Sequence, residues 1–168
     1  MSRPWREANS PPKDTGWLFI SMEMMNSPAW EVAPAEVKLV VLRLVQEHHA
    51  HAGMENGRLQ TTYDQFERFG ISRRRIKWAV RSAQALGFID VLHRGSAYGD
   101  LTRKAEYRLT FRPSVSPEMD MPTNRWKRFK TEMEALAALP EKPSTKGPPT
   151  VAAKKKTQLQ GETIPVAG

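Results

Sequence analysis

The thirteen prolines of this 168-residue chain separate a segment that can build regular structure from segments that cannot. All of them lie in residues 1–34 or 113–168, so residues 35–112 contain none. Because proline lacks a backbone N–H and interrupts helices and sheet ladders, this proline-free block is the expected folded core. Composition then predicts four regions: a flexible N-terminal arm at 1–15, a folded domain at 16–112, a linker with an amphipathic helix at 113–140, and a disordered basic tail at 141–168.

A complete amphipathic helix is predicted between Ser72 and Gly87. The Ser72 hydroxyl can cap the first turn, and Gly87 can adopt the left-handed conformation that ends a helix. One face is an apolar stripe at helical spacing, formed by Ile76, Ala79, Val80, Ala83 and Leu86. The opposite face carries a cluster of cations around an indole, formed by Arg74, Lys77, Trp78 and Arg81.

A second helix is predicted directly before the cationic one. Thr62 and Gln65 fit a capping box, in which the side chain of each residue binds the backbone N–H of the other. The helix that they open runs to Gly70, and the turn 70–72 leads into the cationic helix. Two helices joined by a short glycine-containing turn are typical of a helix-turn-helix.

After Gly87 the apolar period changes from 3.6 to 2, which predicts strands. Residues 88–93 and 105–111 both alternate, and a glycine-containing loop joins them, so they are expected to pair as an antiparallel hairpin. The loop at 94–104 carries Arg94, Arg103 and Lys104. A helix-turn-helix followed by a hairpin with a basic loop is the winged-helix arrangement, in which the loop is the wing.

The net charge of +8 is concentrated on these elements. Residues 71–112 contain ten basic and three acidic residues, which gives this segment a charge of +7. A basic patch of this kind is the electrostatic footprint of a face that binds a polyanion.

Two further helices provide candidate surfaces for a partner chain. From Ala35 onward, an apolar stripe predicts a helix, and two leucines widen it so that contact on two sides is expected: Val37, Leu39, Val40, Val41, Leu42, Leu44 and His48. In the helix predicted at 124–139, four apolar residues form a two-heptad stripe: Trp126, Phe129, Met133 and Leu136. A homodimer through either helix is therefore a possibility that the sequence leaves open.

Several segments between Leu18 and Phe111 resemble the winged-helix domains of bacterial plasmid and phage replication-initiator-like proteins and of mobile-element regulators. The resemblance is carried by Leu18-Phe19-Ile20, Ser27-Pro28-Ala29-Trp30, the helix 35–45, Asn56-Gly57-Arg58-Leu59, the helices 62–70 and 72–87, and the strands that begin at Phe88 and Ala105. It implies an α+β, mainly α fold, a winged helix-turn-helix, to which the apolar stripe at 124–139 and the composition of residues 141–168 add a C-terminal helix and a disordered tail. It also implies a regulator of transcription or replication that binds specific double-stranded DNA sequences, and composition leads us to expect this regulator in the cytoplasm, associated with the nucleoid.

On this interpretation the 72–86 helix lies in the major groove and the wing follows the DNA backbone. Base contacts are expected from the outward face of the helix, where arginine can pair with two acceptors on guanine: Arg74, Lys77, Trp78 and Arg81. Phosphate contacts are expected from the flanks of the helix and from the wing: Ser72, Arg73, Arg75, Arg94, Arg103 and Lys104. For Trp78 two roles stay open, contact with a sugar or thymine methyl and burial under the N-terminal arm or a partner protein.

No enzymatic activity, cofactor or metal is expected. The chain has no cysteine, neither common phosphate-binding glycine motif occurs, and its four histidines do not supply a four-ligand metal site. No apolar run is long enough to cross a bilayer. The competing class of function is a protein-interaction adaptor, in which the winged helix is a scaffold and the 124–139 helix or the first helix is the working surface.

Overall fold

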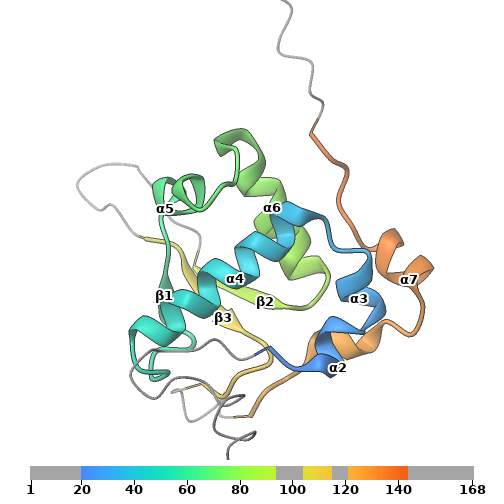
Figure 1. Cartoon of the computed structure of the whole chain (residues 1–168), viewed down its shortest axis with the longest axis horizontal. Coiled ribbons are helices and arrows are strands. Elements are labelled where there is room, and N and C mark those ends of the chain that lie inside the picture. The colour runs from blue at the N-terminus through green and yellow to red at the C-terminus, as the bar shows by residue number, and fades with distance from the viewer. Residues whose placement is uncertain (1–19, 94–103, 115–120, 144–168) are drawn as a thin grey trace, which may run out of the picture.

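The computed structural model describes residues 20–93, 104–114 and 121–143. Within these residues the chain is α+β, with six α-helices, a short 3₁₀ helix and a three-stranded antiparallel sheet (Figure 1). The elements, in chain order, are α2 (Met22–Met25), α3 (Pro28–Glu31), α4 (Ala35–Ala50), β1 (Leu59–Gln60), α5 (Tyr63–Arg68), α6 (Arg73–Ala85), β2 (Ile89–His93), β3 (Glu106–Leu109), the 3₁₀ helix η2 (Arg125–Arg128) and α7 (Glu132–Ala137).

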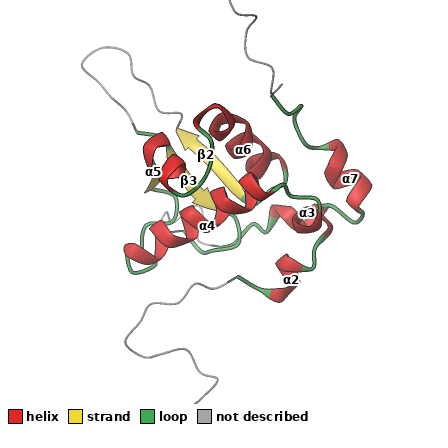
Figure 2. Ribbon diagram, turned by 45° about the horizontal axis from the view of Figure 1, so that its top comes forward, coloured by secondary structure: helices red, strands yellow, loops and turns green. Residues whose placement is uncertain are grey.

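The sheet has the strand order β1-β3-β2. Strands β2 and β3 pair antiparallel, with Ile89 opposite Leu109, so the predicted pairing of these two segments is confirmed. On its other side β3 pairs with β1, where Leu59 lies opposite Tyr107. Helix α4 crosses one face of this sheet and packs along α6 (Figure 2).

The core lies between α4, α6 and the sheet. The predicted apolar stripes are confirmed, because Val37, Val40, Val41, Leu44, Ile76, Ala79, Ala83 and Leu86 are all fully buried. Helix α5 is held to the sheet by Phe66, whose ring packs edge-to-face on Tyr107 with the ring centroids 6.1 Å apart. Burial stabilises a protein by about 1.5–3 kcal/mol for each large apolar side chain, so these contacts fix the position of α6 against the rest of the domain.

The ends of α5 and α6 follow local signals in the sequence. The capping box is confirmed: the Gln65 backbone N–H donates to the Thr62 hydroxyl at 3.3 Å, and the Thr62 N–H donates to the Gln65 side chain at 2.8 Å. Gly87 has φ +82, as the helix end requires. The prediction for Ser72 is wrong in part, because this residue precedes α6 but its side chain makes no capping hydrogen bond.

The prediction of a single helix at 124–139 is wrong. Residues 125–128 form the 3₁₀ helix η2, Phe129 is extended with ψ 121, and α7 begins only after Thr131, whose hydroxyl accepts from the Glu134 N–H at 3.3 Å. The break lets Trp126 and Phe129 turn into the core, where they are 3% and 9% exposed. The expected stripe is therefore divided: these two aromatic residues are buried, whereas Met133 and Leu136 of α7 are exposed.

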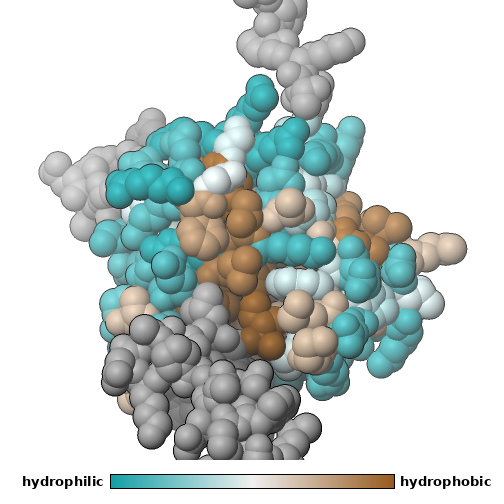
Figure 3. Space-filling view, viewed as in Figure 1, coloured by the Kyte–Doolittle hydropathy of each residue, from teal (hydrophilic) through white to brown (hydrophobic). Residues whose placement is uncertain are grey.

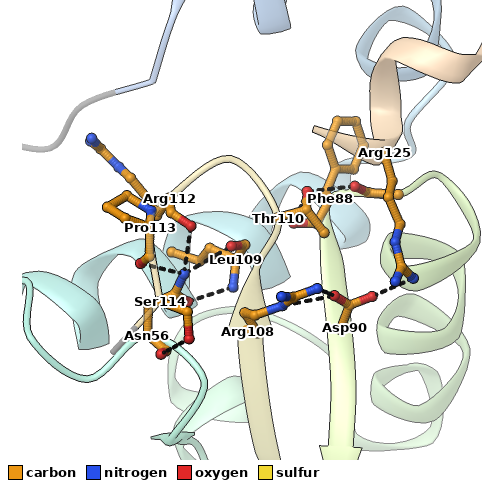
Figure 4. Close-up of polar contacts among 11 residues, drawn as sticks. Asn56, Phe88, Asp90, Arg108, Leu109, Thr110, Arg112, Pro113, Ser114 and Arg125 are labelled. Atoms are coloured by element: carbon orange, nitrogen blue, oxygen red, sulfur yellow. Dashed lines mark hydrogen bonds and ion pairs between the residues drawn. The ribbon is translucent and has the colours of Figure 1, made fainter. Parts of the chain in front are cut away.

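The segment that contains η2 lies against the start of β2. A Cβ on Gly87 would be 2.7 Å from the carbonyl carbon of Arg125, so only glycine permits this close approach of two backbones. The Asp90 carboxylate binds both Arg108 of β3 and Arg125 of η2 (Figure 4). The Asn124 N–H donates to the Thr110 carbonyl at 2.9 Å. The folded contacts thus extend well beyond residue 112, where the sequence predicted a linker.

Asn56 connects the loop before β1 to the end of β3. Its side-chain NH₂ donates to the carbonyls of Leu109, Arg112 and Pro113 at 2.9–3.0 Å, and its Oδ1 accepts from the Leu109 N–H at 2.7 Å (Figure 4). The residue is 1% exposed. It therefore fixes the end of β3 by satisfying backbone groups that would otherwise be buried without partners.

Apolar side chains form a band across the middle of the face on which α4 lies in front, with polar side chains around it (Figure 3). Leu39 and Leu42 of α4 are partly buried, and Leu39 packs against the core. Contact of a second chain with this side of α4 stays a prediction. None of the helices in the described part of the chain combines the length and the apolarity needed to cross a membrane.

Candidate nucleic-acid interface

Helix α6 presents its cations along one exposed strip. Arg74, Lys77, Arg81 and Gln84 are exposed, whereas the residues of the apolar stripe are buried. At about 100° per residue, Arg74 and Arg81 differ in direction by about 20°, and Lys77 lies about 60° from Arg74. The three cations therefore project from the same side of the helix, away from the core.

These three side chains have no acidic partner among the described residues. The ion pairs of α6 within that part of the chain are those of Arg73 and Arg75. An exposed cation without a carboxylate partner keeps its full charge for an external anion. We call the surface formed by Arg74, Lys77 and Arg81 the open cation strip.

Arg73 and Arg75, both expected to contact phosphate, bind carboxylates of this chain. Arg73 pairs with Asp64 and Glu67 of α5, and Arg75 pairs with Glu36 of α4. The hydrogen bond from Arg73 lowers the pKa of Asp64, and the same pairing raises the pKa of Arg73. Two of the predicted phosphate contacts thus hold α6 to its neighbours in the fold.

Glu36 is the least exposed of these three carboxylates, with its side chain 17% exposed. Burial acts to raise its pKa, but hydrogen bonds from its own backbone and from Arg75, together with the charges of Lys142 and Arg75, outweigh burial and lower it. Glu36 is therefore ionised at neutral pH. It anchors α6 to the first turn of α4, where a negative charge also suits the helix dipole.

Trp78 is buried and faces the chain's own C-terminal segment. It is 6% exposed, and its indole N–H donates to the carbonyl of Pro140 at 3.0 Å. The ammonium of Lys142 lies 5.2 Å from the ring centroid. The sequence left open whether DNA or protein covers this residue; in the structure the cover is a segment of the same chain, so the indole is not positioned as a base contact.

The remaining predicted phosphate contacts divide between exposed residues and residues that the structure does not describe. Ser72 is exposed, and its hydroxyl makes no capping bond to α6. Lys104 is exposed two residues before β3. Arg94 and Arg103 lie outside the described residues, as do all but one of the residues 94–104 that were predicted to form a wing.

Two cations that lie beside α6 were not predicted from the sequence to belong to the interface. Arg128 donates a hydrogen bond to the carbonyl of Ala85, the last residue of α6, and its guanidinium lies 4.6 Å from the ring centroid of Phe129. Lys142 lies over Trp78 in the middle of α6. The sequence placed Arg128 on a long amphipathic helix and Lys142 in a disordered tail, so neither was assigned to the interface.

The described residues hold no group of three or more histidines and carboxylates that could bind a metal ion. His48, the one buried histidine, is 9% exposed, and its Nδ1 atom has no hydrogen-bond partner. Burial lowers the pKa of His48, and the nearby charges of Arg112 and His49 lower it further. His48 therefore belongs to the core as a neutral imidazole.

The chain was also compared with known proteins. No protein family, curated protein or solved structure matches it.

Proposed function

We propose that this protein binds double-stranded DNA as a winged helix, with α6 in the major groove. The observation that carries the proposal is the open cation strip, because Arg74, Lys77 and Arg81 project together from a helix whose other arginines are paired within the fold. The surroundings of α6 also fit: α5 and α6 are joined by a short turn at Gly70, and the β2–β3 pair follows in a sheet of order β1-β3-β2. This connectivity suits a recognition helix followed by a wing.

Within this proposal Arg74 is the principal base reader. It lies in the first turn of α6, and recognition helices contact base edges with their N-terminal residues. Its guanidinium can donate two hydrogen bonds to O6 and N7 of guanine. Lys77 and Arg81 contact bases or phosphates further along the groove, and Ser72 and Lys104 contact phosphates. The resemblance of several segments to the winged-helix domains of bacterial replication-initiator-like proteins and mobile-element regulators supports a role in sequence-specific regulation of transcription or replication.

The test starts from the selection of bound sequences among genomic fragments. On the selected duplex, Arg74→Ala is expected to cost about 1–3 kcal/mol of binding free energy and to relax the base preference at one position. Arg58→Ala is the matched control, since Arg58 is exposed in the loop before β1. If Arg74→Ala leaves both specific and non-specific binding unchanged, α6 is not a recognition helix.

The adaptor function is favoured by a different observation. Met133 and Leu136, which are three residues apart on α7, are 80% and 54% exposed, and exposed apolar side chains that lie together can form a patch that binds a partner. A gel shift on random duplex at two salt concentrations separates the classes, because a basic recognition face must bind non-specifically at low salt. Absence of a shift at low salt favours the adaptor, and light scattering then reports whether the partner is a second copy.

A further inference from the structure

The segment after α7 lies along one flank of α6. The described chain turns past α6 after α7 and ends there (Figure 1). Ala138 and Leu139 pack against the core, and the Pro140 carbonyl accepts the indole N–H of Trp78. Beyond it, Lys142 places its ammonium over the indole ring. A segment more than fifty residues away in sequence thus brings a cation next to the open cation strip.

Arg128 occupies the same flank near the end of α6. Its hydrogen bond goes to Ala85, which lies about 20° from Arg74 around the helix axis, while Trp78 lies about 40° from Arg74 in the same direction. Lys77 lies on the opposite side of Arg74. Arg128 and Lys142 therefore border one edge of the strip, at two points separated by seven residues or about 10 Å of helix.

We propose that Arg128 and Lys142 bind the phosphates of one DNA strand while the open cation strip faces the bases, and that Trp78 is a positioning residue for Lys142. This inference rests on the proposed function. The major groove is about 12 Å wide and a helix with its side chains is about 10–12 Å across, so the flanks of an inserted helix meet the sugar-phosphate backbone. Cations held at that edge are placed to bind phosphate oxygens.

Charge balance supports these two residues as anion contacts. Glu36 lies 4.0 Å from the Lys142 ammonium, but the same carboxylate also pairs with Arg75. One carboxylate shared by two cations leaves a net positive charge. Arg128 binds a neutral carbonyl, and among the described residues no carboxylate pairs with it. Both flank cations therefore add to the positive potential along α6.

Trp78 acts through the segment rather than on DNA directly. Trp78 is 6% exposed, and the Pro140 carbonyl and the Lys142 ammonium both lie against its indole, so little of the ring is left to contact DNA. The indole ring orients the Lys142 ammonium, and the indole N–H holds the backbone in place at Pro140 through its hydrogen bond to the carbonyl. Trp78→Phe keeps an aromatic ring but removes the hydrogen bond to Pro140, which frees the segment that carries Lys142.

The experiment measures how the affinity of the full chain for a short mixed-sequence duplex depends on salt. The slope of log K against log salt is negative, and Lys142→Gln and Arg128→Gln are each expected to reduce its magnitude by about 0.9, the value for one lost phosphate contact. Lys142→Arg should restore the slope. Lys130→Gln removes the same charge from the same segment, but Lys130 hydrogen-bonds to Lys127 rather than to α6, so its slope should equal that of the wild type.

Trp78→Phe should reduce the magnitude of the slope, and adding Lys142→Gln should reduce it no further than Lys142→Gln alone, because both changes remove one contact. A merely structural role for Trp78 would change thermal stability and leave the slope intact. Wild-type slopes for both Lys142→Gln and Arg128→Gln would overturn the inference. Tighter binding by either variant would also overturn it, because the segment would then obstruct α6. In both cases weaker binding of the selected duplex by Arg74→Ala preserves the proposed function, whereas absence of wild-type binding at low salt defeats both proposals.

Discussion

Asp90→Ala is expected to destabilise the protein by about 3–5 kcal/mol, the usual cost of leaving a buried charge unpaired. The Asp90 carboxylate accepts from Nε of Arg108 at 2.9 Å and from Nη1 of Arg125 at 2.8 Å. Asp90 and Arg108 are 6% and 5% exposed, so removal of the carboxylate leaves a buried guanidinium without its counter-charge.

Arg125→Ala removes the third member of the same network at much smaller cost. The Arg125 side chain is 53% exposed, and solvent screens its attraction to Asp90. Exposed ion pairs contribute about 0–1 kcal/mol, so the two substitutions should differ by at least about 2 kcal/mol although both break an ion pair of Asp90. Replacing the buried guanidinium as well, in Asp90→Ala/Arg108→Met, should recover part of the lost stability because no unpaired charge remains.

Urea denaturation followed by far-ultraviolet circular dichroism measures these differences, provided that the m-values stay equal among the variants. Asp90→Ala should unfold at the lowest urea concentration, the double variant at a higher one, and Arg125→Ala close to the wild type. Equal midpoints for Asp90→Ala and Arg125→Ala would refute the reasoning, since the burial of Arg108 would then carry no energetic penalty.

Two other predictions concern stability. Gly87→Ala should lower the unfolding free energy more than Gly53→Ala, although both glycines have positive φ. A Cβ on Gly87 would lie 2.7 Å from the backbone of Arg125, whereas on Gly53 the nearest atom is a His48 side-chain atom at 3.7 Å. Equal unfolding free energies would contradict the close approach at Gly87. Stability should also fall with pH: the folded pKa of His48 lies below its unfolded value near 6.5, so the unfolded chain binds more protons and stability declines from about pH 6.5 downward. Unfolding titrations of His48→Gln should show a weaker decline than those of the wild type, and an equal decline in both proteins would contradict the assignment of this proton uptake to His48.

Elements with local signals were predictable from the sequence. The stripes of α4 and α6, the capping box at Thr62 and the left-handed Gly87 all depend on residues within a few positions of one another. The β2–β3 pairing was predictable for a similar reason, because two alternating segments separated by one loop have few alternatives. Such signals specify elements and their faces, and therefore the strip that contains Arg74.

The division of the C-terminal segment had a signal that the longer apolar pattern obscured. Thr131-Glu132-Met133-Glu134 has the spacing of a capping box, and in the structure Thr131 caps α7. The heptad spacing of Trp126, Phe129 and Met133 favoured one continuous helix. Tertiary contacts accompany the break: the backbone of Arg125 and Trp126 lies against Gly87, Trp126 and Phe129 are both buried, and Phe129 is extended.

Net charge located the candidate interface but could not select its residues. Of the five cations in the first nine residues of α6, Arg73 and Arg75 bind carboxylates that lie between six and thirty-nine positions away, while Arg128 and Lys142 come to the same helix from distant sequence. A charge count over 71–112 includes the first pair and omits the second. The useful quantity is therefore the set of cations near α6 that no carboxylate neutralises, and it becomes visible only when the partners of each cation are known. Trp78 illustrates the difference between the predicted and the observed surface. The sequence placed it among cations that face outward, whereas in the structure its indole N–H binds the Pro140 carbonyl and so connects a distant segment to the same surface.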